Sequence, residues 1–216
     1  MITKTYHAQG LITAEELESF IRKEGFYDSY YFDFCLKGVN FVLSHNEFNP
    51  FEEQDYTPTL LSLSRRYTYG VKELEDKDGT IRHIQDFEDY VDLEVWLDKN
   101  GYIYKPFEKY EHSTLAFRLL EDTTDNLTCR FDSCIGGYLV MKKSDLKAYR
   151  NVKKLSEKIL EDEFKLWKQL LNEFENYVNG NQFTLSINDT DYYDFECVWD
   201  ACEIIANYLN AQEKAS

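Results

Sequence analysis

The sequence is poor in the two residues that most often interrupt helices and strands. Among 216 residues there are only 3 prolines and 9 glycines, so long elements with few breaks are expected. It also lacks any apolar run near the roughly 18 to 20 residues that span a bilayer, and no apolar stretch follows a basic start at the N-terminus. We therefore expect a cytoplasmic protein.

The signatures of common enzyme and metal-site classes are also missing. The sequence contains no GxxxxGK[ST], GxGxxG, HExxH or GxSxG segment, so phosphate loops, dinucleotide folds, zinc proteases and serine hydrolases are not indicated. Its four histidines stand apart, and the acids from 189 to 196 lack the glycine and terminal glutamate of a calcium loop. We expect no metal and no cofactor, and we favour a binding protein over an enzyme.

Positive charge is scarce relative to negative charge. The chain has 24 Lys and Arg against 40 Asp and Glu, a formal charge of −16. Such a charge repels nucleic acid and anionic membranes and attracts a basic protein surface. Solubility alone is the alternative explanation. The expected partner is therefore a basic protein surface, with no direct nucleic-acid contact and no membrane contact.

What the chain does contain is enough apolar material for a folded core. Hydrophobic residues make up 43% and aromatic residues 16%, which is unlike a disordered acidic tail. The length suits a single domain over 1–216. Periodicity and stop signals predict, in chain order, a helix at 14–24, two strands within 27–45, a strand at 60–69, a helix at 152–178, a strand at 182–187 and a closing helix from 199. The first helix should begin with a capping box at Thr13 and Glu16, the two strands should turn near Lys37-Gly38, and the long helix should stop at Asn179-Gly180.

One segment, 86–98, fits both periodicities. Its apolar residues alternate as in a strand, but some also repeat every four residues as in a helix. We favour a helix because Asn100-Gly101 is a good helix stop before the strand-like 102–107; a hairpin through the same Asn-Gly is the alternative. The expected fold is α+β: a mainly antiparallel sheet with one long helix and a C-terminal helix.

Two cysteine hexapeptides share one pattern: CRFDSC at 129–134 and CVWDAC at 197–202. Four cysteines could bind zinc, but an aromatic residue lies inside each pair and neither segment has the glycine of a tight knuckle. An odd total of five cysteines, in a chain without an export signal, indicates reduced thiols. We expect these cysteines to be ordinary core residues.

A second interpretation assigns chemistry to one hexapeptide. Cys129 would be the nucleophile, His112 the base that activates it, and Asp132 the acid that orients the base, with Ser133 nearby as a further candidate catalytic residue. The competing interpretation is structural, because buried cysteines and turn aspartates are common in protein cores. The sequence alone leaves both open.

Charges of one sign cluster along the chain, which predicts a polar docking surface or a solvated helix face. A basic run extends from 142 to 158, with lysines at 142, 143, 147, 153, 154 and 158 and an arginine at 150. Two acidic segments contain no basic residue, and the residues we expect to bind the partner are Asp86, Glu88, Asp89, Asp92, Glu94, Asp189, Asp191 and Asp194.

Four segments, read in order, carry a family resemblance. They are SRRYTYG at 64–70, EHST at 111–114, TCRFDSCIGGYLV at 128–140 and FECVW at 195–199. They resemble the HRRYxLG, DHSG, SCxWDSGxxG and DSCWG segments of a family of small proteins of unknown function, encoded by phages and mobile elements of Gram-positive bacteria. The resemblance covers roughly 60–205; the helix-strand-strand portion 1–59 has no counterpart in it.

The resemblance implies a set of polar residues that act together. For a pocket it would supply Arg65, Arg66, Tyr67 and Ser113 as ligand-binding residues beside His112, Cys129, Asp132 and Ser133. The same groups could instead form a buried hydrogen-bond network that stabilises the sheet. The chain departs from the family pattern at Ser64, which replaces His, and at Thr114 and Cys134, which replace Gly. Cysteine at a glycine position indicates that the cysteine pairing is incidental.

The resemblance also implies a phage or mobile-element setting. Together with the acidic charge and the missing catalytic signatures, it leads us to expect a phage-type accessory protein in the host cytoplasm. This protein would bind and inhibit a host nucleic-acid-acting defence system, CRISPR or restriction, by occupying a basic surface. Two alternatives stay open: a small-ligand or nucleotide-processing enzyme with an Arg/His/Cys pocket, and an oligomeric structural protein.

Overall fold

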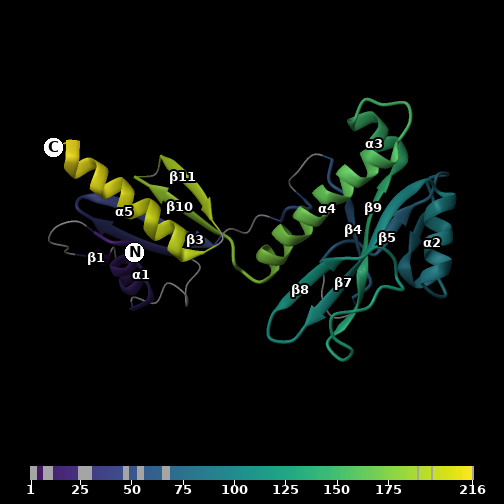
Figure 1. Ribbon diagram of the computed structural model, residues 1–216, viewed down its shortest axis with the longest axis horizontal. Helices are drawn as coiled ribbons and strands as arrows, with labels where there is room; N and C mark the ends of the chain where they lie inside the picture. Colours follow the sequence, from purple (N-terminus) through teal and green to yellow (C-terminus); the bar gives the residue numbers. More distant parts are fainter. Residues whose placement is uncertain are drawn as a thin grey trace. The chain divides into compact units, whose positions relative to one another are not determined.

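A computed structural model shows an α+β protein, which confirms the expected fold class (Figure 1). It describes residues 4–6, 12–23, 31–45, 49–52, 56–64, 69–188, 190–195 and 197–215. The chain groups into two compact units, which we name by their place in the sequence. The terminal unit comprises Met1–Phe48 with Asn176–Ser216, and the central unit comprises Asn49–Glu175. Whether each unit folds by itself is a question of stability, so the expected single domain stays a prediction.

The terminal unit is built on a five-stranded sheet in the order β1-β2-β3-β10-β11. Only β1 and β2 are parallel, and the other neighbours are antiparallel. Helices α1 and α5 pack against each other and share one apolar core with the sheet. The element bounds are β1 Lys4–Tyr6, α1 Ala14–Lys23, β2 Tyr31–Leu36, β3 Val39–His45, β10 Phe183–Ile187, β11 Asp191–Phe195 and α5 Val198–Ala215.

Local chemistry explains the start of α1 and the β2–β3 turn. Thr13 and Glu16 form the predicted capping box: the Thr13 hydroxyl accepts from the Glu16 amide at 3.3 Å, and the Glu16 carboxylate accepts from the Thr13 amide at 3.2 Å. Strands β2 and β3 turn at Lys37 and Gly38, with φ values of 49° and 81°, as a tight two-residue hairpin requires. Both predictions are confirmed.

The central unit contains a four-stranded antiparallel sheet in the order β4-β9-β7-β8 and a separate β5–β6 hairpin. Helix α2 and β5 cover one face of the sheet, where Leu93, Leu97 and Leu74 pack on Tyr138 and Val140. The bounds are β4 Thr59–Ser62, β5 Glu73–Glu75, β6 Ile81–His83, the 3-10 helix η2 Ile84–Asp86, α2 Tyr90–Lys99, β7 Tyr102–Glu111, β8 Leu115–Leu119, β9 Ser133–Lys142, α3 Lys143–Tyr149 and α4 Glu157–Val178.

The long helix α4 packs on the central sheet through aromatic side chains. The Phe174 ring lies 5.5 Å from that of Phe117 in β8. The Glu175 carboxylate accepts from the Phe117 amide at 2.7 Å. Because β8 is an edge strand of this sheet, that carboxylate occupies a backbone donor that another strand would otherwise use.

Three sequence expectations differ from the structure in extent. The segment 86–98 contains helix α2, as favoured, beginning at the Asp89 cap. The predicted strand 60–69 ends at Ser62, and 65–68 lie outside the described residues. The predicted helix 152–178 begins only at 157, after Ser156, whose hydroxyl accepts from the Ile159 amide at 3.4 Å.

A glycine pair bends β9 in the middle of the central sheet. The pairing of β9 with β7 shifts between Phe107 and Glu108, because Phe107 faces Gly137 and Glu108 faces Ile135. Gly136 is therefore the extra residue of a β-bulge. A Cβ on Gly137 would lie 2.1 Å from the Leu61 carbonyl oxygen in β4, so close pairing of β4 with β9 requires glycine there.

Candidate functional site

Three polar residues singled out from the sequence, His112, Cys129 and Asp132, meet at one end of the central sheet. Strand β7 ends where β9 begins, with Tyr110 opposite Ser133, so the β7–β8 turn lies beside the loop before β9. His112 Nδ1 is 3.9 Å from Asp132 Oδ2, and the Cys129 thiol donates to the same oxygen at 3.5 Å. His112, Cys129 and Asp132 therefore come together, which the sequence alone had left open.

Their order does not suit nucleophilic catalysis. Activating a thiol requires an imidazole next to the sulfur and a carboxylate behind the imidazole. Here the Asp132 carboxylate lies between the thiol and the ring. The His112 side chain is 70% exposed, and nothing in the described contacts turns it toward Cys129. The geometry favours a loop held by hydrogen bonds.

The buried part of this arrangement is Glu108, which is 1% exposed. Its carboxylate accepts from the Thr128 amide at 2.6 Å and the Thr128 hydroxyl at 3.0 Å. Arg118 donates to it through Nε at 2.8 Å and Nη2 at 2.7 Å. Burial raises the pKa of Glu108, but hydrogen bonds from Ser133, Thr128 and Arg118 lower the pKa by more, so its net shift is downward. The carboxylate therefore fastens the loop to the sheet in its ionised form.

Replacing Glu108 by Gln should lower the unfolding free energy at neutral pH. It should also make the unfolding free energy depend less on pH in the acidic range. A lowered folded pKa contributes stability above the ordinary value near 4.5, and that stability is lost as the pH falls through the folded pKa. We expect a loss of about 2 kcal/mol in unfolding free energy at pH 7, shrinking toward pH 3. Urea unfolding at both pH values measures this. The control is Glu121→Gln, because the Glu121 side chain is 86% exposed. If the unfolding free energies of wild type and Glu108→Gln fell equally between pH 7 and pH 3, the role given to the ionised Glu108 would be contradicted.

The predicted ligand-binding residues divide between described and undescribed parts of the chain. Arg65, Arg66 and Tyr67 lie outside the described residues, so their role stays a prediction. Ser113 is exposed in the β7–β8 turn. Ser133 belongs to the loop network, since its hydroxyl accepts from the Cys129 amide at 3.1 Å.

The acidic segment on and before α2 forms an exposed surface of the central unit. It has acids at 86, 88, 89, 92, 94 and 98 and no basic residue from 86 to 98. Three apolar side chains on α2 are exposed among them: Tyr90 at 43%, Val91 at 65% and Val95 at 45%. We call these acids and three apolar residues the α2 surface. Exposed apolar residues within a polar rim are typical of interaction sites.

Several of these acids also hold the helix in place. Asp89 caps α2 by accepting from the Asp92 amide at 2.9 Å, and Asp86 accepts from the His83 amide at 3.0 Å. Glu94 accepts from the Tyr138 hydroxyl at 2.9 Å. Glu88 is exposed and is the acid whose change would disturb α2 least.

The second predicted acidic set belongs to the terminal unit. Asp191 and Asp194 lie in β11, opposite Ile187 and Thr184 of β10. Asp189 is outside the described residues, as are the side chains of 191–194. A partner-binding role for this set stays a prediction.

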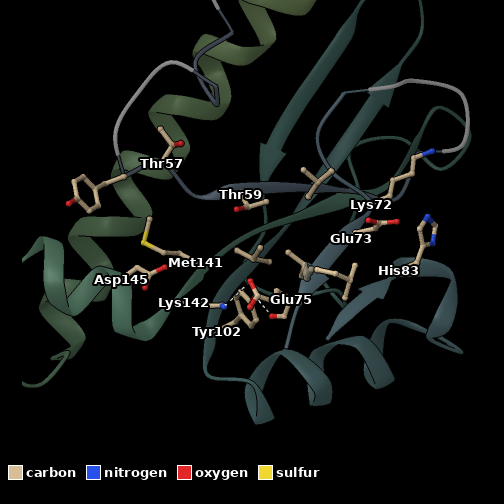
Figure 2. Close-up of a pocket in the computed structure, with 15 residues that line it drawn as sticks. Thr57, Thr59, Lys72, Glu73, Glu75, His83, Tyr102, Met141, Lys142 and Asp145 are labelled. Atoms are coloured by element: carbon tan, nitrogen blue, oxygen red, sulfur yellow. Dashed lines mark hydrogen bonds and ion pairs between the residues drawn. The ribbon is translucent and has the colours of Figure 1, made fainter. Parts of the chain in front are cut away.

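A cleft that the sequence did not indicate lies at the other end of the central sheet (Figure 2). Its volume is about 900 Å³, and its walls come from the chain before β4, the β5–β6 hairpin and the ends of β7 and β9. The lining mixes Val71, Ile81 and Met141 with charged side chains and contains none of His112, Cys129, Asp132 and Ser133. No local sequence pattern marks this cleft, because its residues converge only through strand pairing.

At the floor of the cleft, Tyr102 and Lys142 surround Glu75. The Tyr102 hydroxyl donates to the Glu75 carbonyl at 2.6 Å, and Lys142 Nζ is 3.8 Å from the Glu75 carboxylate. Burial, with the nearby Glu75 charge, raises the pKa of Tyr102 to about 12. The hydroxyl therefore remains a donor at physiological pH.

The expectation that the hexapeptide cysteines are core residues is wrong for most of them. Cys202 is buried, but Cys129 is half-buried and Cys134 and Cys197 are exposed. Burial raises the pKa of Cys202 to about 12, so that thiol stays protonated. All five cysteines are free thiols. Within the described ranges, no group of three or more His, Cys, Asp or Glu side chains is placed to hold a metal ion.

Fold and sites together define an α+β protein with an acidic, partly apolar helix surface, a network-bound loop and an open cleft. No protein-family model, curated protein or solved structure matches the chain. Across the described residues, none of the helices combines the length and apolar character needed to cross a membrane.

Proposed function

We propose that this protein acts by binding, as an acidic accessory protein of the phage type that inhibits a host nucleic-acid-acting defence system. The target would be a CRISPR or restriction nuclease in the host cytoplasm, and the contact would be a basic surface that otherwise holds nucleic acid. The observation that carries the proposal is the α2 surface, where exposed apolar side chains lie among acids without any neighbouring base in sequence.

The α2 surface supplies the two contributions that such binding needs, which are negative charge and apolar contact. Carboxylates take the place of phosphates on the basic groove, and the net charge of −16 speeds encounter with a positive surface. Val91 and Val95 lie one helical turn apart and add apolar contact that phosphates cannot offer. Because of this apolar contact, the expected partner is a protein surface and not free cations in solution.

The resemblance to mobile-element proteins supports the phage setting, and the loop geometry supports binding over catalysis. An enzyme remains the alternative if a nucleotide or other small ligand occupies the cleft. A melting assay with a nucleotide panel separates the two, because a ligand-dependent shift would favour the enzyme.

The test is inhibition of purified nucleases of the CRISPR and restriction classes from a Gram-positive host. We expect the wild-type chain to block DNA binding and cleavage, and the inhibition to weaken as NaCl rises from about 50 to 300 mM. Glu88→Lys with Val91→Lys should lower the inhibitory potency at least tenfold. This variant places two positive charges on the α2 surface without removing a helix cap.

The matched control is Glu161→Lys with Leu166→Lys on α4. Glu161 is exposed and Leu166 is 46% exposed, so the control makes the same charge change on another surface. Equal melting temperatures would show that both variants fold. Inhibition that resists high salt, or that both variants lose equally, would count against charge mimicry by α2. Failure to inhibit either nuclease class would overturn the proposed function.

A further inference from the structure

The loop network presents one side chain that the fold does not use. Phe131 is 90% exposed, the highest value among the exposed large apolar side chains of the described residues. Its neighbours Cys129 and Asp132 have hydrogen-bond partners within the loop. An aromatic ring left in water forgoes the free energy that burial would supply, so an occupant that covers Phe131 would gain it.

The loop that carries Phe131 is held on both sides. Before it, the Thr128 amide and hydroxyl bind the buried Glu108 carboxylate. After it, the Asp132 carbonyl accepts from the Glu111 amide at 2.8 Å, and the Ser133 amide donates to the Cys129 carbonyl at 3.2 Å. A loop backbone held in this way loses little further entropy on binding, so Phe131 is presented as an anchor residue would be.

Arg130 is the cation next to Phe131, and it is exposed. On the other side of Phe131 the Asp132 carboxylate accepts from the Cys129 thiol within the loop, and the His112 side chain is 70% exposed on the adjacent turn. We call Arg130, Phe131 and His112 the tip. A complementary site would combine an apolar recess with carboxylates.

The cleft at the opposite end of the same sheet has that combination. Val71 and Ile81 line it and are 42% and 57% exposed. Its carboxylates, Glu73, Glu75 and Asp145, outnumber its lysines, Lys72 and Lys142. Figure 2 shows Glu73 and Glu75 on the hairpin side and Asp145 on the α3 side of the cleft. A volume of about 900 Å³ has room for an aromatic ring with a neighbouring arginine.

The tip and the cleft of one molecule cannot meet. Strand β9 has ten residues and runs from the tip at Ser133 to the cleft at Lys142. At about 3.3 Å per residue, the two ends lie roughly 30 Å apart. Both sites belong to the central unit, so their separation is fixed by the sheet.

We propose that the tip of one copy inserts into the cleft of a second copy, with Phe131 against Val71 and Ile81 and Arg130 toward the cleft carboxylates. The contact is heterologous, so each copy has a tip and a cleft to offer, and association continues until a ring closes or a short filament forms. This proposal stands independently of the proposed inhibitor role, since it uses neither the α2 surface nor a host protein.

Salt should strengthen this contact between copies, whereas it should weaken binding to a basic nuclease. Each copy carries a charge of −16, so two copies repel at long range, while the ring insertion is apolar. Screening by salt weakens the repulsion more than the insertion. We expect self-association to strengthen from 50 to 300 mM NaCl, whereas binding to a basic nuclease should weaken.

Sedimentation velocity of the full chain over a concentration series tests the proposal. Wild type should sediment as a mixture whose average mass grows with concentration above the 25.7 kDa protomer. Phe131→Ser, which removes the tip, and Ile81→Lys, which places a positive charge in the cleft, should each weaken self-association at least tenfold. Mixed together, the two variants should form a one-to-one dimer that grows no further, because one retains a cleft and the other a tip.

The control variants are Leu166→Ser and Gln169→Lys on α4, which remove an exposed apolar side chain and add an exposed charge elsewhere. Both should associate like wild type. A wild-type chain that stays monomeric up to about 1 mM would overturn the proposal, as would Phe131→Ser associating like wild type. A mixture of the two variants that stays monomeric would also refute it. Inhibition of nucleases by a fully monomeric chain would leave the inhibitor role intact while excluding the head-to-tail contact.

Discussion

Substituting Gly137 by Ala should cost about 3 kcal/mol of unfolding free energy, among the largest losses for one added methyl group. The new Cβ would lie 2.1 Å from the Leu61 carbonyl oxygen and 2.9 Å from the Phe107 ring. Leu61 and Phe107 are both 0% exposed, so neither can move toward solvent. The expected result is separation of β4 from β9 and loss of cooperative unfolding of the central unit.

Gly101→Ala is the matched control in the same unit. Gly101 has a φ of 76°, and a Cβ there would have no heavy atom within 4 Å. Its substitution should cost only the backbone strain of a left-handed residue, about 1 kcal/mol. Chemical denaturation followed by circular dichroism measures both variants. Similar losses at the two positions would show that the clash with Leu61 is relieved and that the close strand contact is dispensable.

Replacing Arg150 by Met should cost about 3 kcal/mol, because it leaves a carboxylate buried without its cation. The Glu163 side chain is 4% exposed and accepts from Arg150 at 2.7 Å and from the Trp167 indole at 3.0 Å. Arg150 follows α3 and Glu163 lies in α4, so this pair holds the corner between the two helices. Urea unfolding at pH 7 gives the loss.

A double variant tests the cause. Arg150→Met with Glu163→Gln removes the charge and keeps an acceptor for the Trp167 indole, so most of the lost stability should return. If the double variant is as unstable as Arg150→Met, lost packing of the arginine is the larger effect, both of its stem and of its guanidinium, whose Cζ lies 5.4 Å from the centre of the Tyr149 ring.

Sequence reasoning predicted elements best where a side chain or an Asn-Gly pair marks an end. The capping box at Thr13, the turn at Gly38 and the helix stops at Asn100 and Asn179 all lie where they were expected. Each signal is local, because the groups that satisfy the backbone lie within four residues of it. Helix α3 was missed since its first cap, Lys142, makes no side-chain hydrogen bond, and its lysines suggested only charge.

Non-local features could not be predicted in the same way. Strand pairing of β4 with β9 joins Thr59 to Val140, and no pattern in either segment specifies the partner. The cleft depends on that pairing, because Thr59 and Val140 both line it. The sequence left open whether His112, Cys129 and Asp132 would meet. Only the geometry showed that they do, with the carboxylate between thiol and ring and with Glu108 as the buried member.

The terminal unit is interrupted by the whole central unit, and this has a consequence for synthesis on the ribosome. Strand β3 is translated early, but its neighbour β10, which pairs Ser186 with Val42, emerges only after residues 49–175 are complete. At roughly 5 to 20 residues per second, the edge of β3 waits about 7 to 28 seconds for its partner. During that interval the central unit already has all of its strands, so it should be the first part of the nascent chain to resist protease.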